Sequence, residues 1–301
     1  MKTRKATFML FTVAGLVALN HPLVVPAQQA QKTQAKHCLW KVEGRTNTAY
    51  LFGSIHFLKK EFYPLAQPIE DAYKRSQVVV FEADLDEMQS PAAQLKMLQH
   101  GKYPEGQTLK QNLSKDTYAK LDAYLSESLG SAALFDGLKP WMVAVALLGM
   151  ELQKLGFNPE QGVDKYFFDK AKEDKKQIVP LETIDFQLGL FAGLTKEEED
   201  AMLKETLQEI TSFKKILTEM TDAWKTGDTK KLDELILDAM RQFPQIHKKL
   251  LIDRNKEWAA KIEKLLAEGK NLFVVVGAAH LVGKDSVVDL LSRKGLKVPQ
   301  M

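Results

Sequence analysis

The chain has 301 residues, of which 45% are hydrophobic, and its 42 basic and 39 acidic side chains give a formal net charge of +3. This composition is typical of a globular protein and excludes a disordered one. Because the charge is nearly balanced, it provides no electrostatic case for nucleic-acid binding, and we expect no nucleic-acid partner.

The first 27 residues have the pattern of a secretory signal peptide. A basic start over residues 1–5 precedes a short apolar run over 8–19 and the small-residue site Val25-Pro26-Ala27. The run is too short to span a bilayer comfortably, so we expect cleavage after Ala27, with an uncleaved anchor as the alternative. We therefore expect an exported protein, periplasmic or extracellular, with no stable transmembrane span after cleavage. Residues 28–37 are polar and are expected to form a disordered leader.

Residues 38–301 are expected to form one domain that opens with a β-hairpin. Two β-prone segments, 39–43 and 49–55, flank the turn sequence Gly44-Arg45-Thr46-Asn47. Further apolar, β-branched runs predict strands at 78–81, 177–181 and 272–276. The one cysteine, Cys38, permits no internal disulfide, and we expect it to be buried.

From about residue 90 to residue 250 the apolar residues recur with helical periodicity. The clearest predicted helices span residues 113–129, 139–155, 164–172, 250–268 and 285–294. This mixture of elements predicts an α/β or α+β fold, with a mixed β-sheet core flanked by helices and a large helical middle. The oligomeric state does not follow from the sequence.

Titratable side chains follow four of the predicted strands at the point where each strand ends. His56 follows the second strand, Glu82 and Asp84 the third, Glu182 the fourth and His280 the last. In open α/β sheets, ligands bind at the carboxyl ends of the strands, because the loops there surround a crevice. Each residue alone also fits a structural role, such as a helix cap or a salt bridge. Their coincidence at four strand ends favours a shared functional site.

Two Gly-x-x-His sequences place Gly53 three residues before His56 and Gly277 three residues before His280. A glycine lets the backbone bend sharply or approach a ligand closely. We predict that both imidazoles face one pocket, although almost the whole mature chain separates them. Two imidazoles much more than about 10 Å apart could not share one metal ion, because histidine nitrogens bind metals at about 2.0–2.1 Å.

Arg254 falls on the apolar stripe of the predicted helix over 250–268, together with Leu251, Trp258 and Ile262. A guanidinium buried there must meet a carboxylate or an anionic ligand, so we expect Arg254 to point into the same pocket. The alternative is a side chain that reaches solvent from the edge of the stripe.

Seven segments carry a resemblance to a known family. In chain order they are Leu39-Trp40-Lys41-Val42, Leu51-Phe52-Gly53-Ser54-Ile55-His56, Phe81-Glu82-Ala83-Asp84, Gly162-Val163-Asp164, Leu181-Glu182-Thr183, Arg254-Asn255 and Val276-Gly277-Ala278-Ala279-His280. The set resembles the TraB/GumN family, which includes the Tiki proteases, over nearly the whole mature chain. The resemblance implies metal-dependent peptidase chemistry and a fold distantly shared with erythromycin-esterase-like hydrolases.

The strand-end residues and the resemblance together predict a metal-dependent hydrolase, a peptidase that acts on a peptide or protein. His56, Glu182 and His280 are the predicted ligands of one divalent ion, Mn, Co or Zn, which would activate a water and polarise the scissile carbonyl. Glu82 is the predicted general base, although the sequence does not decide which glutamate is the base and which is the ligand.

The remaining candidate residues have supporting roles in this hypothesis. Arg254 would stabilise the developing oxyanion or orient a glutamate, and Asn255 is assigned to the catalytic set beside it. Gly53, Gly277 and Asp84 are assigned as supporting residues of the site.

Two alternatives stay open at this point. The first is a metal-free, esterase-like hydrolase in which His56 or His280 is the general base and Glu82 orients it. The second is a non-enzymatic binding or scaffold protein of the cell envelope, whose helical middle forms a surface for a partner.

Overall fold

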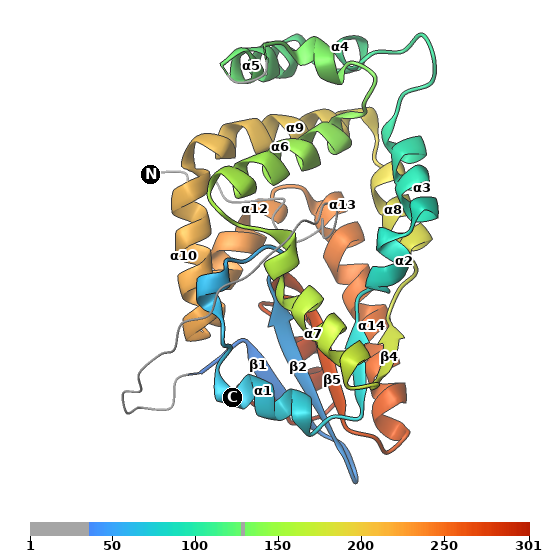
Figure 1. Ribbon diagram of the computed structural model, residues 1–301, viewed down its shortest axis with the longest axis vertical. Helices are drawn as coiled ribbons and strands as arrows, with labels where there is room; N and C mark the ends of the chain where they lie inside the picture. The colour runs from blue at the N-terminus through green and yellow to red at the C-terminus, as the bar shows by residue number, and fades with distance from the viewer. Residues whose placement is uncertain (1–35, 128–129) are drawn as a thin grey trace.

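The computed structural model of the protein describes residues 36–127 and 130–301 and contains a five-stranded mixed sheet, which lies in the lower half of Figure 1. The strands are β1 (Leu39–Glu43), β2 (Thr48–Ser54), β3 (Val78–Phe81), β4 (Gln177–Pro180) and β5 (Leu272–Gly277). The predicted signal peptide, 1–27, and residues 28–35 of the predicted leader lie outside the described residues. The mixed sheet with flanking helices confirms the predicted fold class.

The strand order across the sheet is β1-β2-β5-β3-β4. β1 pairs antiparallel with β2 and forms the predicted hairpin, whereas β2, β5, β3 and β4 are parallel neighbours. Every residue of β3 and β5 is buried, as expected for apolar, valine-rich strands inside a parallel sheet. β4 is a partly exposed edge strand that ends at Pro180, which has no N–H for the ladder. The four parallel strands therefore end at one edge of the sheet.

Helices make up most of the remaining chain. The helices before β4 are α1 (Gln67–Lys74), α2 (Leu85–Gln89), α3 (Pro91–Gly101), α4 (Leu109–Asn112), α5 (Lys115–Ser126), α6 (Pro140–Lys154) and α7 (Val163–Glu173). Those after β4 are α8 (Ile184–Ala192), α9 (Lys196–Glu209), α10 (Phe213–Thr226), α11 (Thr229–Leu232), α12 (Asp238–Met240), α13 (Pro244–His247), α14 (Asp253–Ala267) and α15 (Val287–Arg293). Within 36–127 and 130–301, no helix combines the length and the hydrophobicity that a membrane crossing requires.

The helical middle covers the edge at which the parallel strands end. In Figure 1, α1 and α7 lie over one face of the sheet, and α6 and α9 lie beyond the tips of the strands. α4 and α5 lie at the end of the molecule farthest from the sheet. The helix predicted over 250–268 begins later than expected, because a π-helical turn (Lys248–Ile252) precedes α14.

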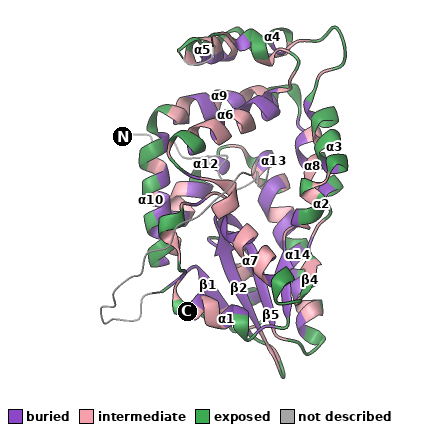
Figure 2. Cartoon of the chain, in the orientation of Figure 1, coloured by how far each residue is buried: buried purple, intermediate pink, exposed green. Residues whose placement is uncertain are grey.

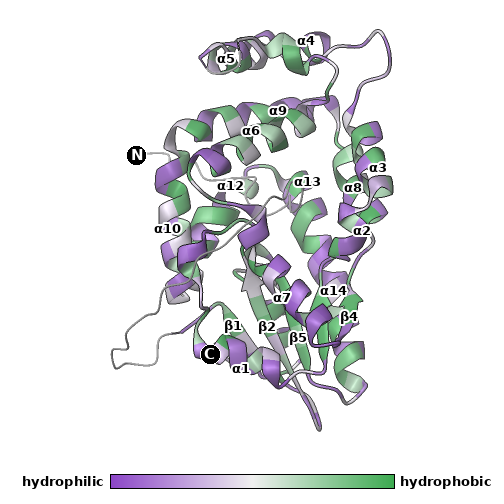
Figure 3. Cartoon of the chain, viewed as in Figure 1, coloured by the Kyte–Doolittle hydropathy of each residue, from purple (hydrophilic) through white to green (hydrophobic). Residues whose placement is uncertain are grey.

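The strands and the inner faces of the helices share one hydrophobic core, as the buried strands in Figure 2 and their apolar residues in Figure 3 show. Phe52, Phe167 and Phe273 pack in its centre, with ring centroids 4.8–5.8 Å apart. Cys38 is buried as predicted, and burial raises the pKa of its thiol. His37, assigned to the leader from the sequence, is also buried, and its N–H donates to the Met301 carbonyl (2.6 Å). The ordered domain therefore includes His37.

Candidate functional site

The carboxyl ends of the parallel strands bring the candidate histidines and glutamates to one place. Ser54, the last residue of β2, pairs with Gly277, the last residue of β5. Beyond β3 and β4, the N–H of Glu182 donates to the carbonyl oxygen of Glu82 (2.8 Å). The two histidines and the two glutamates thus follow neighbouring strands that end together.

His56, Glu82 and His280 surround Gly277. A Cβ atom on Gly277 would lie 3.2 Å from Oε1 of Glu82, 3.6 Å from Nε2 of His56 and 3.7 Å from Cδ2 of His280. The two imidazoles therefore lie closer together than the limit of about 10 Å for a shared ion. The Gly277 N–H also donates to Oε1 of Glu82 (2.7 Å). A Cβ atom there would be tight only against Glu82, and it would meet the two imidazoles at ordinary contact distance.

Gly53 has a structural role instead. A Cβ atom on Gly53 would lie 3.1 Å from the Cα atom of Ala278, which is tighter than ordinary van der Waals contact. The Gly53 carbonyl accepts a hydrogen bond from Nε1 of Trp224 (2.7 Å). Gly53 therefore allows β2 to pass close to the loop after β5.

Arg254 is only 4% exposed, and its guanidinium joins both glutamates. Nε lies 3.0 and 3.1 Å from the two carboxylate oxygens of Glu182, and Nη2 lies 2.9 Å from Glu182 and 3.0 Å from Glu82. Nη1 donates to the Leu250 carbonyl (3.0 Å) and lies 3.3 Å from Nε2 of His280. Burial lowers the pKa of Arg254, but the two carboxylates outweigh burial and the net shift is upward. The guanidinium is therefore a permanent cation inside the cluster.

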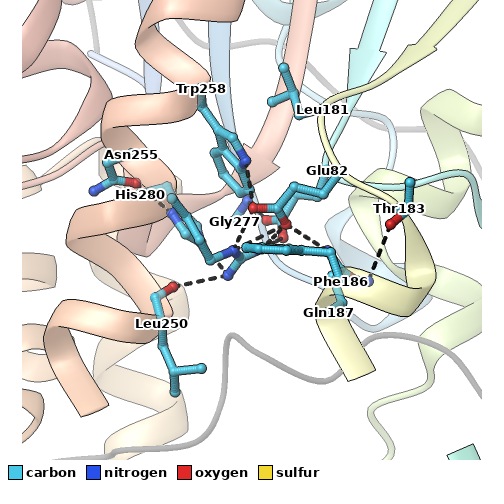
Figure 4. Close-up of polar contacts among 12 residues, drawn as sticks. Glu82, Leu181, Thr183, Phe186, Gln187, Leu250, Asn255, Trp258, Gly277 and His280 are labelled. Atoms are coloured by element: carbon cyan, nitrogen blue, oxygen red, sulfur yellow. Dashed lines mark hydrogen bonds and ion pairs between the residues drawn. The ribbon is translucent and has the colours of Figure 1, made fainter. Parts of the chain in front are cut away.

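Trp258 lies one turn after Arg254 on α14 and holds the cluster from a second side. Its indole Nε1 donates to Oε1 of Glu182 (2.8 Å), and its ring centroid lies 4.2 Å from that of His280. The guanidinium carbon of Arg254 lies 4.6 Å from the indole centroid, within cation–π range. Figure 4 shows Glu82, Trp258 and His280 pointing toward one another. Both oxygens of Glu182 thus accept hydrogen bonds from α14.

Asn255 determines which nitrogen of His280 carries the proton. Its Oδ1 lies 2.6 Å from Nδ1 of His280, and its Nδ2 donates to the Asp285 carbonyl (2.9 Å). With the amide held in this direction, Oδ1 only accepts, so Nδ1 of His280 is the protonated nitrogen. Burial, then the charge of Arg254, then His56 lower the pKa of His280 well below its usual value. His280 is therefore neutral, and its Nε2 accepts a hydrogen bond from Arg254.

Asp164 supplies a carboxylate to His56, and the residue-by-residue sequence argument did not identify it. Its Oδ1 lies 3.2 Å from Nδ1 of His56, and both side chains are buried. The two meet because α7 starts against the loop after β2, where the Val163 N–H donates to the Ile55 carbonyl (3.0 Å). A Cβ atom on Gly162 would lie 2.2 Å from the His56 carbonyl oxygen, so only glycine permits this approach. The sequence offered one signal for Asp164, because the segment Gly162-Val163-Asp164 is part of the family resemblance.

Asp84, assigned to the site from the sequence, is instead the N-cap of α2. Its side chain accepts hydrogen bonds from the N–H groups of Asp86 (2.9 Å) and Glu87 (3.2 Å). An aspartate at this position stabilises the first turn of the helix. Asp84 belongs to the helix that follows Glu82 and not to the polar cluster.

A cavity of about 370 Å³ opens at this edge of the sheet, between the strand ends and the helices α2, α3, α6 and α8. His56, Glu82 and Asp164 line one part of it, and most of the other lining side chains are apolar. Glu182, Arg254 and His280 do not line the cavity. The cluster thus has two halves. In one, Arg254 of α14 contacts Glu182 and His280 away from the cavity, and the other faces the cavity.

The predicted metal ligands do not fit an ion in this arrangement. The oxygens of Glu182 accept from Arg254 and Trp258, and the two nitrogens of His280 face Asn255 and Arg254. Over residues 36–127 and 130–301, no group of three or more His, Cys, Asp or Glu side chains is disposed to hold a metal. The cation in contact with both Glu82 and Glu182 is the Arg254 guanidinium.

A family model described as the TraB/PrgY/gumN family matches residues 38–300. The chain belongs to the TraB/PrgY/gumN family. The chain is also similar to the uncharacterized protein YbaP of Escherichia coli (strain K12), which is 26% identical over 80% of this chain and 87% of that protein. No solved structure is a significant match to the chain.

Proteins named as metalloproteases are also among its relatives. Metalloprotease TIKI1 of Danio rerio is 23% identical over 97% of this chain and 71% of its own length. Human metalloprotease TIKI1 is 23% identical over 89% of this chain and 62% of its own length.

Proposed function

We propose that this protein is a hydrolase that cleaves a peptide or related acyl bond where His56 and Glu82 line the cavity. The observation that carries the proposal is the arrangement of His56, Glu82 and His280 around Gly277. Titratable groups that gather beside a cavity are the arrangement expected of an active site. The distant metalloprotease relatives support the same class of reaction.

His56 is the proposed general base. With the Asp164 carboxylate 3.2 Å from Nδ1, the favoured neutral tautomer carries its proton on Nδ1 and leaves Nε2 able to accept one. Water adds to the acyl carbon as Nε2 takes its proton. The bond from the acyl carbon to the leaving nitrogen or oxygen then breaks, and the leaving group receives the proton. The products are a carboxylic acid and an amine or alcohol.

Glu82 is proposed to orient the reacting groups. Its Oε1 accepts from the Gly277 N–H, and its Oε2 accepts from Arg254. These two bonds hold the carboxylate beside Nε2 of His56. Arg254 is a positioning residue in this scheme, because it contacts Glu82 and does not line the cavity.

We also propose that hydrolysis depends on a divalent ion, Mn, Co or Zn. The relatives that are named metalloproteases support this part of the proposal. The formal charges also support it, because one guanidinium faces two carboxylates and Asp164 adds a third. An ion bound by Glu182 and His280 would require Arg254 to release them. The contacts of Arg254 favour the second candidate, a metal-free hydrolase in which His56 acts directly.

A chelation experiment separates the two forms. Purified protein is incubated with a strong chelator and dialysed, and hydrolysis of a peptide library and of acyl esters is measured before and after addition of Mn²⁺, Co²⁺ or Zn²⁺. Loss of activity and its recovery with an ion establish metal dependence, whereas unchanged activity establishes the metal-free form. If neither treatment reveals hydrolysis by folded protein, the hydrolase proposal is wrong and the binding-protein alternative stands.

Export to the cell envelope is a further part of the proposal. It is supported by the basic and apolar pattern over residues 1–27. Cell fractionation, with mass spectrometry of the mature N-terminus, tests it. A chain that starts at residue 28 and fractionates with the periplasm or medium agrees with export, and a full-length cytoplasmic chain contradicts it.

A further inference from the structure

The cavity beside His56 extends far beyond the space that a reacting carbonyl needs. Its volume of about 370 Å³ is more than twice that of an engineered cavity of about 150 Å³ that binds benzene. Trp141 and Leu152, near opposite ends of α6, both line it. Leu152 lies eleven positions after Trp141, which corresponds to about 16 Å along the helix axis. The cavity is therefore elongated along α6.

The His56 end and the Trp141 end of the cavity are distinct. After α6 the chain returns to the strand edge, where the backbone of Asn158 pairs with that of Leu58, two residues after His56. The carboxyl end of α6 therefore lies near His56. Trp141 lies in the first turn of α6 and therefore at the opposite end of the cavity. Its ring stacks on that of Phe191 of α8, with centroids 5.4 Å apart.

The wall between these ends does not suit a peptide backbone. Most of its side chains are apolar, and three glutamines supply the other polar groups. Two of these amides already donate, Gln94 to the Gln89 carbonyl (3.2 Å) and Gln187 to Glu182 (3.3 Å). A peptide in the cavity would leave several buried N–H and C=O groups without partners, which is costly. An aliphatic chain requires no such partners, and the flexible side chains of Met88 and Met97 adapt to its shape.

We propose that the cavity binds an aliphatic acyl chain of the substrate, with its carbonyl at His56 and Glu82 and the end of the chain toward Trp141. The chemical step of this inference rests on the proposed hydrolase activity, which releases the chain as a carboxylic acid. It assigns the substrate class as acyl esters or amides with long chains.

Gly149 offers a way to fill the cavity without disturbing the site. It lies on α6 and lines the cavity, and nothing lies within 4 Å of the position of a Cβ atom on it. A Gly149→Phe side chain would enter that space. The substitution should not weaken α6, because glycine has a lower helix propensity than phenylalanine. Gly189→Phe is the matched control, because Gly189 is an exposed helical residue of α8 with equally open surroundings and does not line the cavity.

Binding of dodecanoate, measured by isothermal titration calorimetry, tests the inference without reference to catalysis. We expect saturable binding to the natural protein, to His56→Gln and to Gly189→Phe, and at least tenfold weaker binding to Gly149→Phe. Absence of saturable binding, or equal affinity in Gly149→Phe, overturns the inference.

Hydrolysis of p-nitrophenyl acetate, octanoate and dodecanoate separates the two proposals. We expect kcat/KM to rise with chain length by at least tenfold, and Gly149→Phe to remove the rise while it leaves acetate hydrolysis intact. Dodecanoate binding without hydrolysis of any ester or peptide contradicts the hydrolase and leaves the acyl site standing. Hydrolysis that does not depend on chain length, together with no dodecanoate binding, contradicts the acyl site alone.

Discussion

Oδ1 of Asn255 lies 2.6 Å from Nδ1 of His280, a contact between α14 and the loop after β5 that fixes the tautomer of a fully buried imidazole. Exchange of this amide for a carboxylate would place a negative charge against Nδ1. We predict that Asn255→Asp raises the pKa of His280, because the carboxylate stabilises the imidazolium. NMR titration of the imidazole carbons measures this pKa, and the spectrum of His280→Gln assigns the signal. An unchanged pKa in Asn255→Asp contradicts the assigned contact.

Removal of the buried guanidinium should strongly destabilise the fold. Arg254→Met leaves the Glu82 and Glu182 carboxylates, whose side chains are 14% and 5% exposed, without their cation. Loss of one partner from a buried ion pair costs about 3–5 kcal/mol. Urea unfolding measures the free energy of unfolding. Arg293→Met is the control, because Arg293 also contacts two carboxylates but lies at the surface, where we expect little effect. Equal effects of the two substitutions would contradict the structural role of Arg254.

Glu199 should make stability fall as the pH rises. Burial, opposed by Lys139, raises the pKa of this α9 carboxyl from 4.5 to about 7. Between these two pH values the folded state keeps a proton that the unfolded state releases. The contribution of Glu199 to the free energy of unfolding is therefore complete below about pH 4.5 and is lost as the pH rises through about 7. We expect Glu199→Gln to exceed the natural protein in stability at pH 8 by about 1–3 kcal/mol and to match it near pH 4. Urea unfolding at both pH values checks this, and exposed Glu197→Gln is the control.

Asp164→Asn should impair hydrolysis without unfolding the protein. The amide keeps the shape of the carboxylate but removes its charge from Nδ1 of His56, so we expect kcat/KM to fall about 10²-fold. Asp169→Asn, on the exposed side of the same helix, should not alter kcat/KM. An unchanged kcat/KM in folded Asp164→Asn would show that Asp164 takes no part in the reaction.

The strand-end residues could be predicted from the sequence because their signals are local. Val78–Phe81 and Leu272–Gly277 are continuous apolar runs, and the residue types that follow them are visible without knowledge of the fold. Arg254 could be predicted to lie inside because helical spacing places it on the stripe of Trp258. Parallel pairing then brings the ends of these strands to one edge of the sheet.

The partners within the cluster could not be predicted, because they depend on contacts between distant segments. Glu182 is bound by Arg254 and Trp258, 72 and 76 residues later in the chain, and no local pattern distinguishes such a carboxylate from a metal ligand. Asp84, like Glu82, is an acidic residue just after β3, but its side chain caps α2. Only its hydrogen bonds to backbone N–H groups reveal this role. Asp164 begins a helix whose docking against His56 depends on Gly162.

The central claim is that hydrolysis takes place at His56, and a comparison of rates with His56→Gln tests it most directly. The best substrate from the peptide and ester panel is used, and the unfolding midpoint of each variant shows that it is folded. Exposed His100→Gln is the control. The account predicts a loss of at least about 10²-fold in kcat for His56→Gln, with an unchanged midpoint, and no loss for His100→Gln. Equal rates for the natural protein and folded His56→Gln would contradict it.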